Sequence, residues 1–385
     1  MNDPFQPLQG IRVIELSHMV MGPSCGMFLA FLGAEVIKVE PPGGDKTRML
    51  TGMGAGFFPM FNRGKKSVCL DLRSEEGKAD LDRLLVDADV FVENFKDSSL
   101  LKMGLDPESL RQRHPDLIIA SNKGFLHGPY QDRTAMDEVV QMMTGLAHMT
   151  GPSGRPLRIG SSANDIMAGL FGALAVLGAL LERKDGGAGR NIRVGLFENC
   201  LLLVGQHMVQ YDIEGTESPP MPERDFSWPV YDIFETADGR KLFIGAITSG
   251  HWNSLCNILS LQGLRDDPGL ASAMDKINAR GRTLPIFAEA IARRTAPELT
   301  AALTANDIPF APILRPVEMY EDPHVNRPGG LVKTWHPDGS SYRAPGLPLE
   351  VDGLPVVVEN TLARAGRDTT EVMQALNRKK TLGDR

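Results

Sequence analysis

Residues 11–39, IRVIELSHMVMGPSCGMFLAFLGAEVIKV, decide how the N-terminal part of this chain folds. The stretch begins with a short apolar run, Ile11–Leu16, which is typical of a buried β-strand. A helix is predicted from Pro23 to Leu32, because proline is favoured in the first turn of a helix. A second apolar run, Ala34–Val39, predicts another strand. The stretch is therefore expected to form a strand–helix–strand unit.

The same alternation continues along the chain. Four further strands are predicted, at residues 67–72, 89–93, 116–121 and 191–194. The helices predicted between and after them lie at residues 75–86, 107–113, 165–181 and 198–211. Short apolar strands that alternate with helices indicate an α/β fold with a mostly parallel sheet. In such a sheet, ligands bind beyond the carboxyl ends of the strands.

A different pattern begins with residues 215–229, which are polar and rich in proline, as is typical of a linker. Beyond them, residues 231–235 and 241–247 flank an Asp-Gly pair and predict a β-hairpin. Helices are predicted at residues 251–260, 279–293 and 297–305. We therefore expect a second, smaller α+β unit, and we expect the proline-containing residues 306–327 to lead back to the first unit.

The composition is that of an ordinary soluble globular protein, with 385 residues, of which 42% are hydrophobic and 23% charged. This length favours two domains. The net charge of −7 argues against a general nucleic-acid-binding protein, whose surface would be basic. The cysteines at positions 25, 69, 200 and 256 are far apart and lack metal-ligand spacing, which indicates a reduced, cytoplasmic protein without a metal site.

Membrane association is not expected. Residues 1–10 are polar and do not begin a signal peptide. Residues 166–181 are the one candidate for a membrane span, but 16 residues are fewer than the roughly 20 that a bilayer needs. The glycines and alanines of this run allow close backbone approach, so a buried helix against a sheet is the better interpretation.

A single carboxylate, Asp165, lies where this apolar helix begins. A helix N-terminus carries unsatisfied N–H groups and a partial positive charge, so we expect Asp165 to stay ionised. In a cleft, such a carboxylate can act as a nucleophile. The alternative is that Asp165, or Asn164 beside it, is only an N-cap. The segment alone favours the N-cap.

The turns that follow successive strands carry a second pattern. These turns are His18–Pro23, Lys38–Asp45 with Arg48, Asp71–Arg73, and Glu93–Lys96 with Lys102 further on. Because the carboxyl ends of parallel strands meet at one edge, the turns are expected to converge there. Several supply lysine or arginine, which suits a ligand with phosphates. For any single residue, a solvated loop cation is the simpler alternative.

Several familiar sites are missing from the sequence. The first strand is not followed by a dinucleotide-binding glycine fingerprint, and no P-loop or H-E-x-x-H motif occurs. A Ser–His–Asp hydrolase is disfavoured because no G-x-S-x-G sequence is found. These absences argue against a nicotinamide dehydrogenase, a nucleotide triphosphatase and a zinc protease.

Several motifs occur together in a fixed order. They are G-I-R-V-I-E-L…G-P (10–23), L-G-A-E-V-I-K-V-E-P-P-G-G-D-x-x-R (32–48), N-R-G-K-K-S-V-x-L-D-L (62–72), V-E-N-F (92–95), Q-M-M-T-G-L…T-G (141–151), D-I-M-A-G (165–169) and G-x-G-R-N (187–191). Each motif is weak by itself, but their collinear order is specific. From about residue 8 to about residue 350 the chain resembles the family III CoA-transferases, a group that includes formyl-CoA transferase, carnitine CoA-transferase and α-methylacyl-CoA racemase.

The resemblance implies an architecture. It implies a large Rossmann-like domain made of residues 1–214 and the return segment 321–385, with a small α+β domain at residues 225–320. It also implies an interlocked homodimer, in which each chain forms a ring threaded by the other. No tightly bound cofactor is implied, because coenzyme A and acyl-CoA are substrates in this family.

The resemblance also implies roles for particular residues. Asp165 matches the family's acyl-carrying nucleophile, which forms a mixed anhydride and then an aspartyl-CoA thioester. The positions that match the family's coenzyme A contacts are Val20, Met21, Lys38, Leu70, Arg73, Asn94, Phe95 and Lys102. The acid pocket is expected near His18, Val20, Met136 and the loop 245–251, which contains Thr248.

Two departures from the family bear on the substrate. Val20 occupies the position of an active-site glutamine of formyl-CoA transferase, which argues against a formyl or oxalate preference. Met136 stands where transferases often carry tyrosine and where the racemase carries its catalytic histidine. Racemisation needs two bases, and methionine is not one, although the adjacent Asp137 keeps that alternative open.

The sequence thus predicts a CoA-transferase that moves CoA between two small carboxylic acids. A moderately apolar or branched acid is expected, with a dicarboxylate as the alternative. The rival functions are an acyl-CoA racemase or epimerase on the same fold, and a CoA-binding protein without turnover.

Overall fold

The computed structural model describes residues 5–184, 186–224, 228–356 and 361–383. The chain divides into two compact units. The first unit comprises Met1–Pro222 and Asn326–Arg385, and the second comprises Glu223–Val325. Of the linker predicted at residues 215–229, residues 225–227 lie outside the described part.

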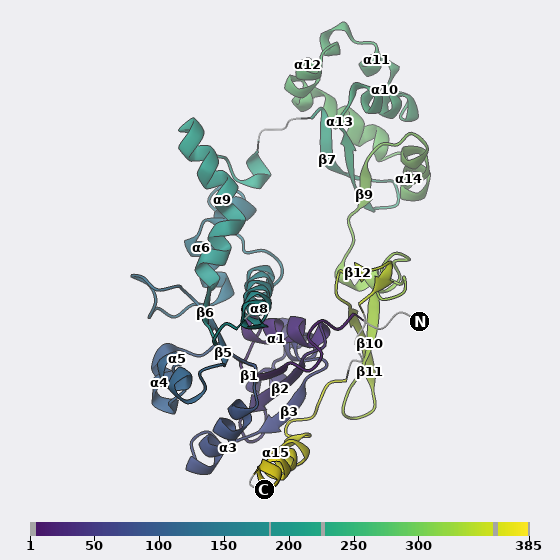
Figure 1. Ribbon diagram of the computed structural model, residues 1–385. Helices are drawn as coiled ribbons and strands as arrows, with labels where there is room; N and C mark the ends of the chain where they lie inside the picture. The colour runs from purple at the N-terminus through teal and green to yellow at the C-terminus, as the bar shows by residue number, and fades with distance from the viewer. Residues whose placement is uncertain (1–4, 185, 225–227, 357–360, 384–385) are drawn as a thin grey trace. The chain divides into compact units, whose positions relative to one another are not determined.

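A six-stranded parallel sheet forms the centre of the first unit (Figure 1). Its strand order is β3-β2-β1-β4-β5-β6, and every neighbouring pair is parallel. The strands are β1 (Arg12–Leu16), β2 (Glu35–Glu40), β3 (Lys66–Cys69), β4 (Val90–Glu93), β5 (Ile118–Lys123) and β6 (Asn191–Gly195). The α/β fold with a mostly parallel sheet is therefore confirmed. The strand order reverses between β1 and β4, where doubly wound folds of this kind bind ligands.

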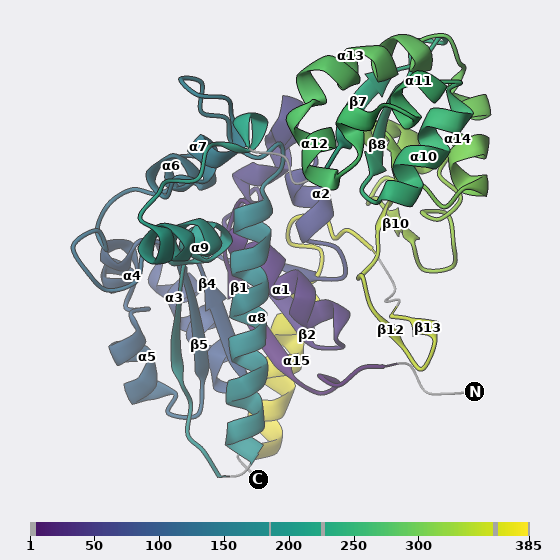
Figure 2. The ribbon, with the colours of Figure 1, turned by 90° about the horizontal axis from the view of Figure 1, so that it is seen from above.

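Helices cover both faces of this sheet (Figure 2). The helices of the unit are α1 (Met21–Phe31), α2 (Phe57–Phe61), α3 (Glu75–Val86), α4 (Asp97–Met103), α5 (Pro107–Arg113), α6 (Asp137–Met143), α7 (Leu146–Thr150), α8 (Ala163–Lys184), α9 (Leu196–Glu214) and α15 (Thr369–Gly383). Apolar residues of α1 and α8 pack on one face, with Val13 and Val36 of the sheet. Residues of α3, α4, α5 and α15 pack on the other, with Ile14 and Ile37. Because both faces are buried, the strands read as continuous apolar runs.

Glycines allow α8 to lie close against α1. A Cβ atom added at Gly169 would lie 2.0 Å from Ser24 Oγ and 2.6 Å from the Met21 carbonyl oxygen. One added at Gly172 would lie 3.1 Å from Cys25 Sγ. The two helices therefore meet backbone to backbone near their N-terminal ends. Among the described helices, α8 alone is long and apolar enough to span a membrane, and 44% of its most apolar window is buried.

The second unit is a small α+β domain. Its antiparallel sheet has the order β7-β8-β9, and β7 and β8 form the predicted hairpin, with Val230 paired to Ala246. The strands are β7 (Val230–Glu235), β8 (Lys241–Ala246) and β9 (Phe310–Pro312), and the helices are α10 (Ser249–Ile258), α11 (Gln262–Arg265), α12 (Ala273–Asn278), α13 (Arg280–Ile291) and α14 (Ala296–Ala305). Trp252 and Phe287 are fully buried in its core and pack edge to face.

The C-terminal segment adds elements that the sequence analysis does not predict. They are the hairpins β10 (Leu331–Trp335) with β11 (Ser341–Pro345) and β12 (Glu350–Val351) with β13 (Leu354–Pro355), together with α15. The start of α15 is bound to β3. The Ser67 amide donates to Asp368 Oδ2 at 2.8 Å, and the Cys69 amide donates to Thr369 Oγ1 at 2.9 Å. These bonds complete the edge of the sheet at β3.

The α1–α8 contact gives a test of the packing. We expect Gly169→Ala to destabilise the protein by about 1–3 kcal/mol, because its new methyl group would overlap Ser24 and the backbone of α1. Gly178→Ala is the matched control in the same helix, where no atom lies within 4 Å of an added Cβ. That change should stabilise the protein by roughly 0.5–1 kcal/mol, because alanine is the better helix former. Urea unfolding of both variants measures the difference, and equal effects would contradict the close contact.

Candidate active site

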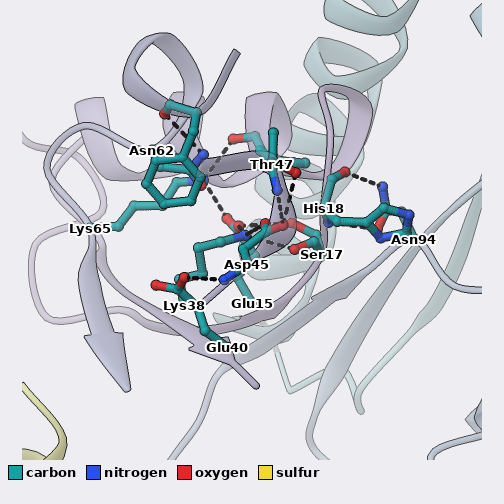
Figure 3. A network of polar contacts seen from close by, with 12 residues as sticks. Glu15, Ser17, His18, Lys38, Glu40, Asp45, Thr47, Asn62, Lys65 and Asn94 are labelled. Atoms are coloured by element: carbon teal, nitrogen blue, oxygen red, sulfur yellow. Dashed lines mark hydrogen bonds and ion pairs between the residues drawn. The ribbon is translucent and has the colours of Figure 1, made fainter. Parts of the chain in front are cut away.

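The turn between β1 and α1 lies at the point where the strand order reverses. Its backbone is bound by side chains from two other loops (Figure 3). The His18 amide donates to Asn94 Oδ1 at 3.0 Å, and Asn94 Nδ2 donates to the His18 carbonyl at 2.8 Å. The Met19 amide donates to Thr47 Oγ1 at 3.2 Å. Met19 has a φ of 63°, a left-handed conformation that costs a non-glycine residue about 1–2 kcal/mol.

Asp165 lies inside the first turn of α8. The helix begins at Ala163, so neither Asp165 nor Asn164 precedes it, and the N-cap interpretation is wrong. Asn164 is instead fully buried. Its Nδ2 donates to the Leu196 carbonyl at 3.2 Å, and its Oδ1 accepts from Asn199 Nδ2 at 2.5 Å. These bonds fix the start of α8 against α9, while the side chain of Asp165 is left half-buried.

The electrostatic environment of Asp165 differs from the expectation. Burial, and then the carboxylate of Asp137, raise the pKa of Asp165 to about 7, and Arg158 offsets this only in part. The prediction that the helix N-terminus keeps this carboxylate fully ionised is therefore wrong near neutral pH. A carboxyl group that titrates near pH 7 is typical of functional sites, where both of its protonation states are accessible.

Asp137 is the first residue of α6 and is itself buried, with 8% of its surface exposed. Its Oδ2 accepts from Gln141 Nε2 at 2.8 Å and lies 3.3 Å from Arg158. Burial raises the pKa of Asp137 as well, although Arg158 and Gln141 oppose the shift. These partners bind only Oδ2, and Oδ1 is buried without a hydrogen-bond partner among the described residues, so the structure leaves Asp137 open as the second base of a racemase.

The N-terminal ends of α1 and α8 bring several predicted residues together. Val20 is buried in a cluster that Ile166 also joins, and Met21 is buried in a cluster with Ala168. The two residues therefore lie beside the helical turn that carries Asp165. Met136 directly precedes α6, and 63% of its surface is exposed.

The other predicted coenzyme A contacts lie along the same edge of the sheet. Asn94 and Phe95 directly follow β4, and the rings of Phe95 and His18 are 5.1 Å apart. Leu70 is buried directly after β3. Arg73 is exposed and pairs with Asp71 at 2.8 Å, which raises the pKa of its guanidinium. Lys102 is exposed in the last turn of α4.

Two predicted residues differ from this arrangement. The side chain of Lys38 is only 2% exposed, and its ammonium donates to the Ser17 carbonyl at 2.7 Å. The side chain of Lys38 is thus not open to a ligand, and the place of Lys38 in the segment that lines the coenzyme A site stays a prediction. Thr248 belongs to the second unit, where its hydroxyl accepts from the His251 amide at the start of α10.

Sequence reasoning missed some of the residues that surround the site. Arg158 and Gln141 hold Asp137, and Asn199 holds Asn164. Arg158 lies in a loop and Gln141 in a short helix, and neither segment has a periodic pattern of apolar residues. Of the two, only Gln141 could have been identified from the sequence, because it begins the Q-M-M-T-G-L motif. Within the residues that the structure describes, no three His, Cys, Asp or Glu side chains are grouped to hold a metal ion.

The raised pKa of Asp165 predicts a pH-dependent effect on stability. The folded pKa of about 7 exceeds the usual aspartate value of 3.8, so the native state loses stability as the pH rises between these two values. Asp165→Asn removes this loss. We expect the variant to melt at a higher temperature than the wild type, with a difference that grows from pH 5 to pH 8. Thermal unfolding at several pH values measures it, and a constant difference would contradict the raised pKa.

Comparisons with known proteins bear directly on this site. Residues 8–369 match the family model described as CoA-transferase family III. The chain is 33% identical to the succinate–glutarate CoA-transferase of Agrobacterium fabrum, over 96% of both chains. It is 30% identical to the formyl-CoA:oxalate CoA-transferase of Rhodopseudomonas palustris, over 95% of this chain and 92% of that protein.

Solved structures agree with these relatives. The crystal structure of a CAIB/BAIF family protein from Brucella suis superposes with a TM-score of 0.88 and 30% sequence identity, covering 96% of this chain and 99% of that one. The resemblance inferred from the ordered motifs is confirmed. The match of the family model to most of the chain, together with enzymes of known type at this level of identity, identifies the chain as a CoA-transferase of family III.

Proposed function

We propose that this CoA-transferase moves CoA from an acyl-CoA thioester to a carboxylic acid through covalent intermediates on Asp165. The observation that carries the proposal is the setting of this carboxyl group. It lies in the first turn of α8, beside the β1–α1 turn, with a pKa raised to about 7. A carboxylate with a raised pKa is a stronger base than ordinary aspartate, and about half of it is ionised at neutral pH.

In the first half-reaction, the carboxylate oxygen attacks the thioester carbonyl of the donor. The C–S bond breaks, a mixed anhydride forms on Asp165, and CoA leaves as the thiolate. The thiolate then attacks the carbonyl carbon that belongs to Asp165. This step releases the donor acid as a carboxylate and leaves an aspartyl-CoA thioester. Backbone N–H groups that a helix leaves unpaired in its first turn suit the stabilisation of the oxyanions.

The second half-reaction runs the same steps in reverse with the acceptor. The acceptor carboxylate attacks the aspartyl-CoA thioester, forms a new anhydride and releases the thiolate again. The thiolate then attacks the carbonyl carbon of the acceptor, which yields the product thioester and the free Asp165 carboxylate. Each intermediate hydrolyses easily, so the site must exclude water. The buried residues around Asp165, such as Val20, Met21 and Ala168, support this requirement.

We further propose that coenzyme A lies along the carboxyl edge of the sheet. Arg73 and Lys102 are exposed cations suited to its phosphates, and half-buried Phe95 suits its adenine ring. Val20, Met21 and Leu70 are buried, so they would act through their backbone groups. Both side-chain groups of Asn94 are hydrogen bonded to the His18 backbone. Asn94 would therefore support the turn that contacts CoA.

The acid is proposed to be a short dicarboxylic acid, with succinyl-CoA as the donor. Several relatives at 30–33% identity are named for the dicarboxylic acids succinate and glutarate, D-citramalate, mesaconate and oxalate, whereas one is named for a fatty acyl-CoA and the oxalate enzyme also for formyl-CoA. His18 and Met136 of the first unit remain proposed pocket residues, and the role of Thr248, which belongs to the second unit, stays a prediction from the sequence. Val20 stands at the position of an active-site glutamine of formyl-CoA transferase, which argues against oxalate as the acid.

A homodimer is also proposed. Several large apolar side chains of the two longest helices of the first unit are exposed in the single chain: Leu170, Phe171 and Leu174 of α8, and Leu202, Met208, Val209, Tyr211 and Ile213 of α9. Exposed apolar side chains gathered on neighbouring elements favour association with another protein surface. A second copy of the chain is the partner that the family resemblance implies.

The covalent step is tested at Asp165. We expect Asp165→Ala to lower the rate of CoA exchange at least about 1,000-fold, because the nucleophile is lost. Asp116→Ala is the control, since Asp116 is an exposed carboxylate before the amino end of β5. Mass spectrometry of peptides from the wild type, quenched during turnover with succinyl-CoA, should find the adduct on Asp165. An adduct on another residue, or a fully active Asp165→Ala variant, would refute the mechanism.

The acid preference is tested with a panel of acceptors. With succinyl-CoA as donor, we expect kcat/KM for glutarate and mesaconate to exceed that for oxalate, formate and butyrate by at least about tenfold. Formate and butyrate lack the second carboxylate that a site built for a dicarboxylic acid binds, and oxalate lacks the carbon chain that separates the two carboxylates. Products are identified as their CoA thioesters by chromatography. A preference for butyrate or another monocarboxylic acid would contradict the dicarboxylate proposal.

A further inference from the structure

Four charged side chains are buried beneath the β1–α1 turn (Figure 3). They are Glu15, Lys38, Asp45 and Lys65, and between 1% and 7% of the surface of the last three side chains is exposed, while Glu15 is fully buried. We call these four residues the buried-charge cluster. Two carboxylates face two ammonium groups, so the formal charges of the cluster cancel.

Glu15 connects the two lysines. Its Oε1 lies 3.3 Å from Lys38 Nζ, and its Oε2 lies 2.6 Å from Lys65 Nζ. Each lysine in turn donates to a backbone carbonyl at one end of the turn. Lys38 Nζ is 2.7 Å from the Ser17 oxygen, and Lys65 Nζ is 2.8 Å from the Pro23 oxygen. One carboxylate therefore fixes both ends of residues 17–23 through the two lysines.

The middle of the turn is connected to the same cluster. Asp45 pairs with Lys38 at 3.2 Å, and its Oδ1 accepts from the hydroxyl of Thr47 at 2.8 Å. The oxygen of Thr47 accepts in turn from the Met19 amide. Burial alone would raise the pKa of Asp45, but Lys38 and Thr47 lower it on balance. Asp45 is thus a charged anchor for the strained residue Met19.

Helix α1 leaves no free space above Glu15. A Cβ atom added at Gly26 would lie 1.8 Å from Glu15 Oε2 and 3.2 Å from Lys65 Nζ. The cluster is therefore packed directly between β1 and α1. Burial lowers the pKa of Lys65 to about 8, although Glu15 opposes the shift.

A buried cluster of paired charges is by itself weak evidence of a stabilising role. Replacement of a buried ion pair by apolar side chains is often neutral or stabilising, because desolvation offsets the attraction between the charges. Charged hydrogen bonds do have defined directions, and they can hold a backbone conformation that would otherwise relax. The left-handed Met19 is such a conformation, and strained residues of this kind persist only where the surroundings hold them.

We propose that Lys65, acting through Glu15 and Lys38, is a positioning residue for the acyl-CoA substrate. It fixes the backbone of residues 17–23, so that Val20 and Met21 present their backbone groups to CoA next to Asp165. This inference rests on the proposed coenzyme A site. Lys65 does not itself touch the substrate, because its ammonium is bound by Glu15, Asn62 and the Pro23 carbonyl.

The test compares two neighbouring lysines. Lys65→Met removes the buried ammonium, whereas Lys66→Met removes a half-exposed one that pairs with Glu35 at 2.8 Å. For Lys65→Met we expect KM for acyl-CoA to rise at least about tenfold, since small displacements of a binding element have effects of this order. The KM for the acceptor acid should stay within about threefold of the wild type, and Lys66→Met should match the wild type. An unchanged KM for acyl-CoA in folded Lys65→Met overturns the proposal.

If Lys65→Met does not fold, a second variant tests whether the binding of acyl-CoA depends on the fixed backbone of residues 17–23. Thr47→Val keeps the shape of the side chain and removes only the bonds to Met19 and Asp45. We expect its KM for acyl-CoA to rise about fivefold, the effect of one lost hydrogen bond. A wild-type value in this variant overturns the proposal, as does a fall in kcat with KM unchanged.

Direct binding separates this inference from the proposed function. Calorimetry with coenzyme A alone requires no turnover. If the wild type binds CoA but exchanges no acid, the proposed reaction fails, and weaker CoA binding by Lys65→Met still supports the positioning role. If all variants bind CoA equally, the positioning role fails, whatever the exchange assay shows.

Discussion

The close approach of α8 to α1 is the constraint on which the candidate site depends. Gly169 leaves room for Ser24 and for the carbonyl of Met21, so the first turns of the two helices meet. Asp165 is carried by one of these turns, and Val20 and Met21 by the other. A side chain at position 169 would separate them by the width of a methyl group or more. Because Gly169 has no side chain, α8 approaches α1 closely enough to place the Asp165 carboxylate near the carboxyl edge of the sheet.

Two aspartates, the buried Asp45 and the half-buried Asp165, show how neighbours decide the charge of a carboxyl group. For both Asp45 and Asp165, burial is the largest influence and favours the neutral form. Asp45 is paired with Lys38 and bonded by Thr47, so its pKa falls below the usual value. Asp165 has Asp137 nearby, and Arg158 compensates only in part, so its pKa rises. The first carboxylate is thus a permanent anchor, while the second is free to change its protonation state at neutral pH.

The sequence predicted the parallel sheet because each central strand is buried on both faces and reads as an apolar run. Helices α3 and α5 begin and end at the residues predicted for them. The burial of Lys38 could not be predicted, because the sequence around a lysine near the end of a strand is the same whether the ammonium contacts solvent or Glu15. The pKa of Asp165 depends on Asp137, which is 28 positions away in the sequence and is brought near by α6. Helix α15 was missed because bonds from Asp368 and Thr369 to β3, rather than apolar periodicity, fix its start.

The groups proposed to bind CoA are mostly fixed backbone atoms, whereas the groups proposed to meet the acid are variable side chains. This difference explains why the type of reaction is easier to infer than the identity of the acid. All the relatives named above share CoA as a reactant, and their names differ in the acid. The groups proposed to bind CoA are mostly backbone atoms, whose positions follow from Glu15, Lys65 and the helix contact. The groups proposed to meet the acid are side chains such as His18 and Met136, whose replacement leaves the backbone unchanged. A family built in this way can change its acid by substitution at a few positions, provided that the turn which holds the shared thioester stays in place.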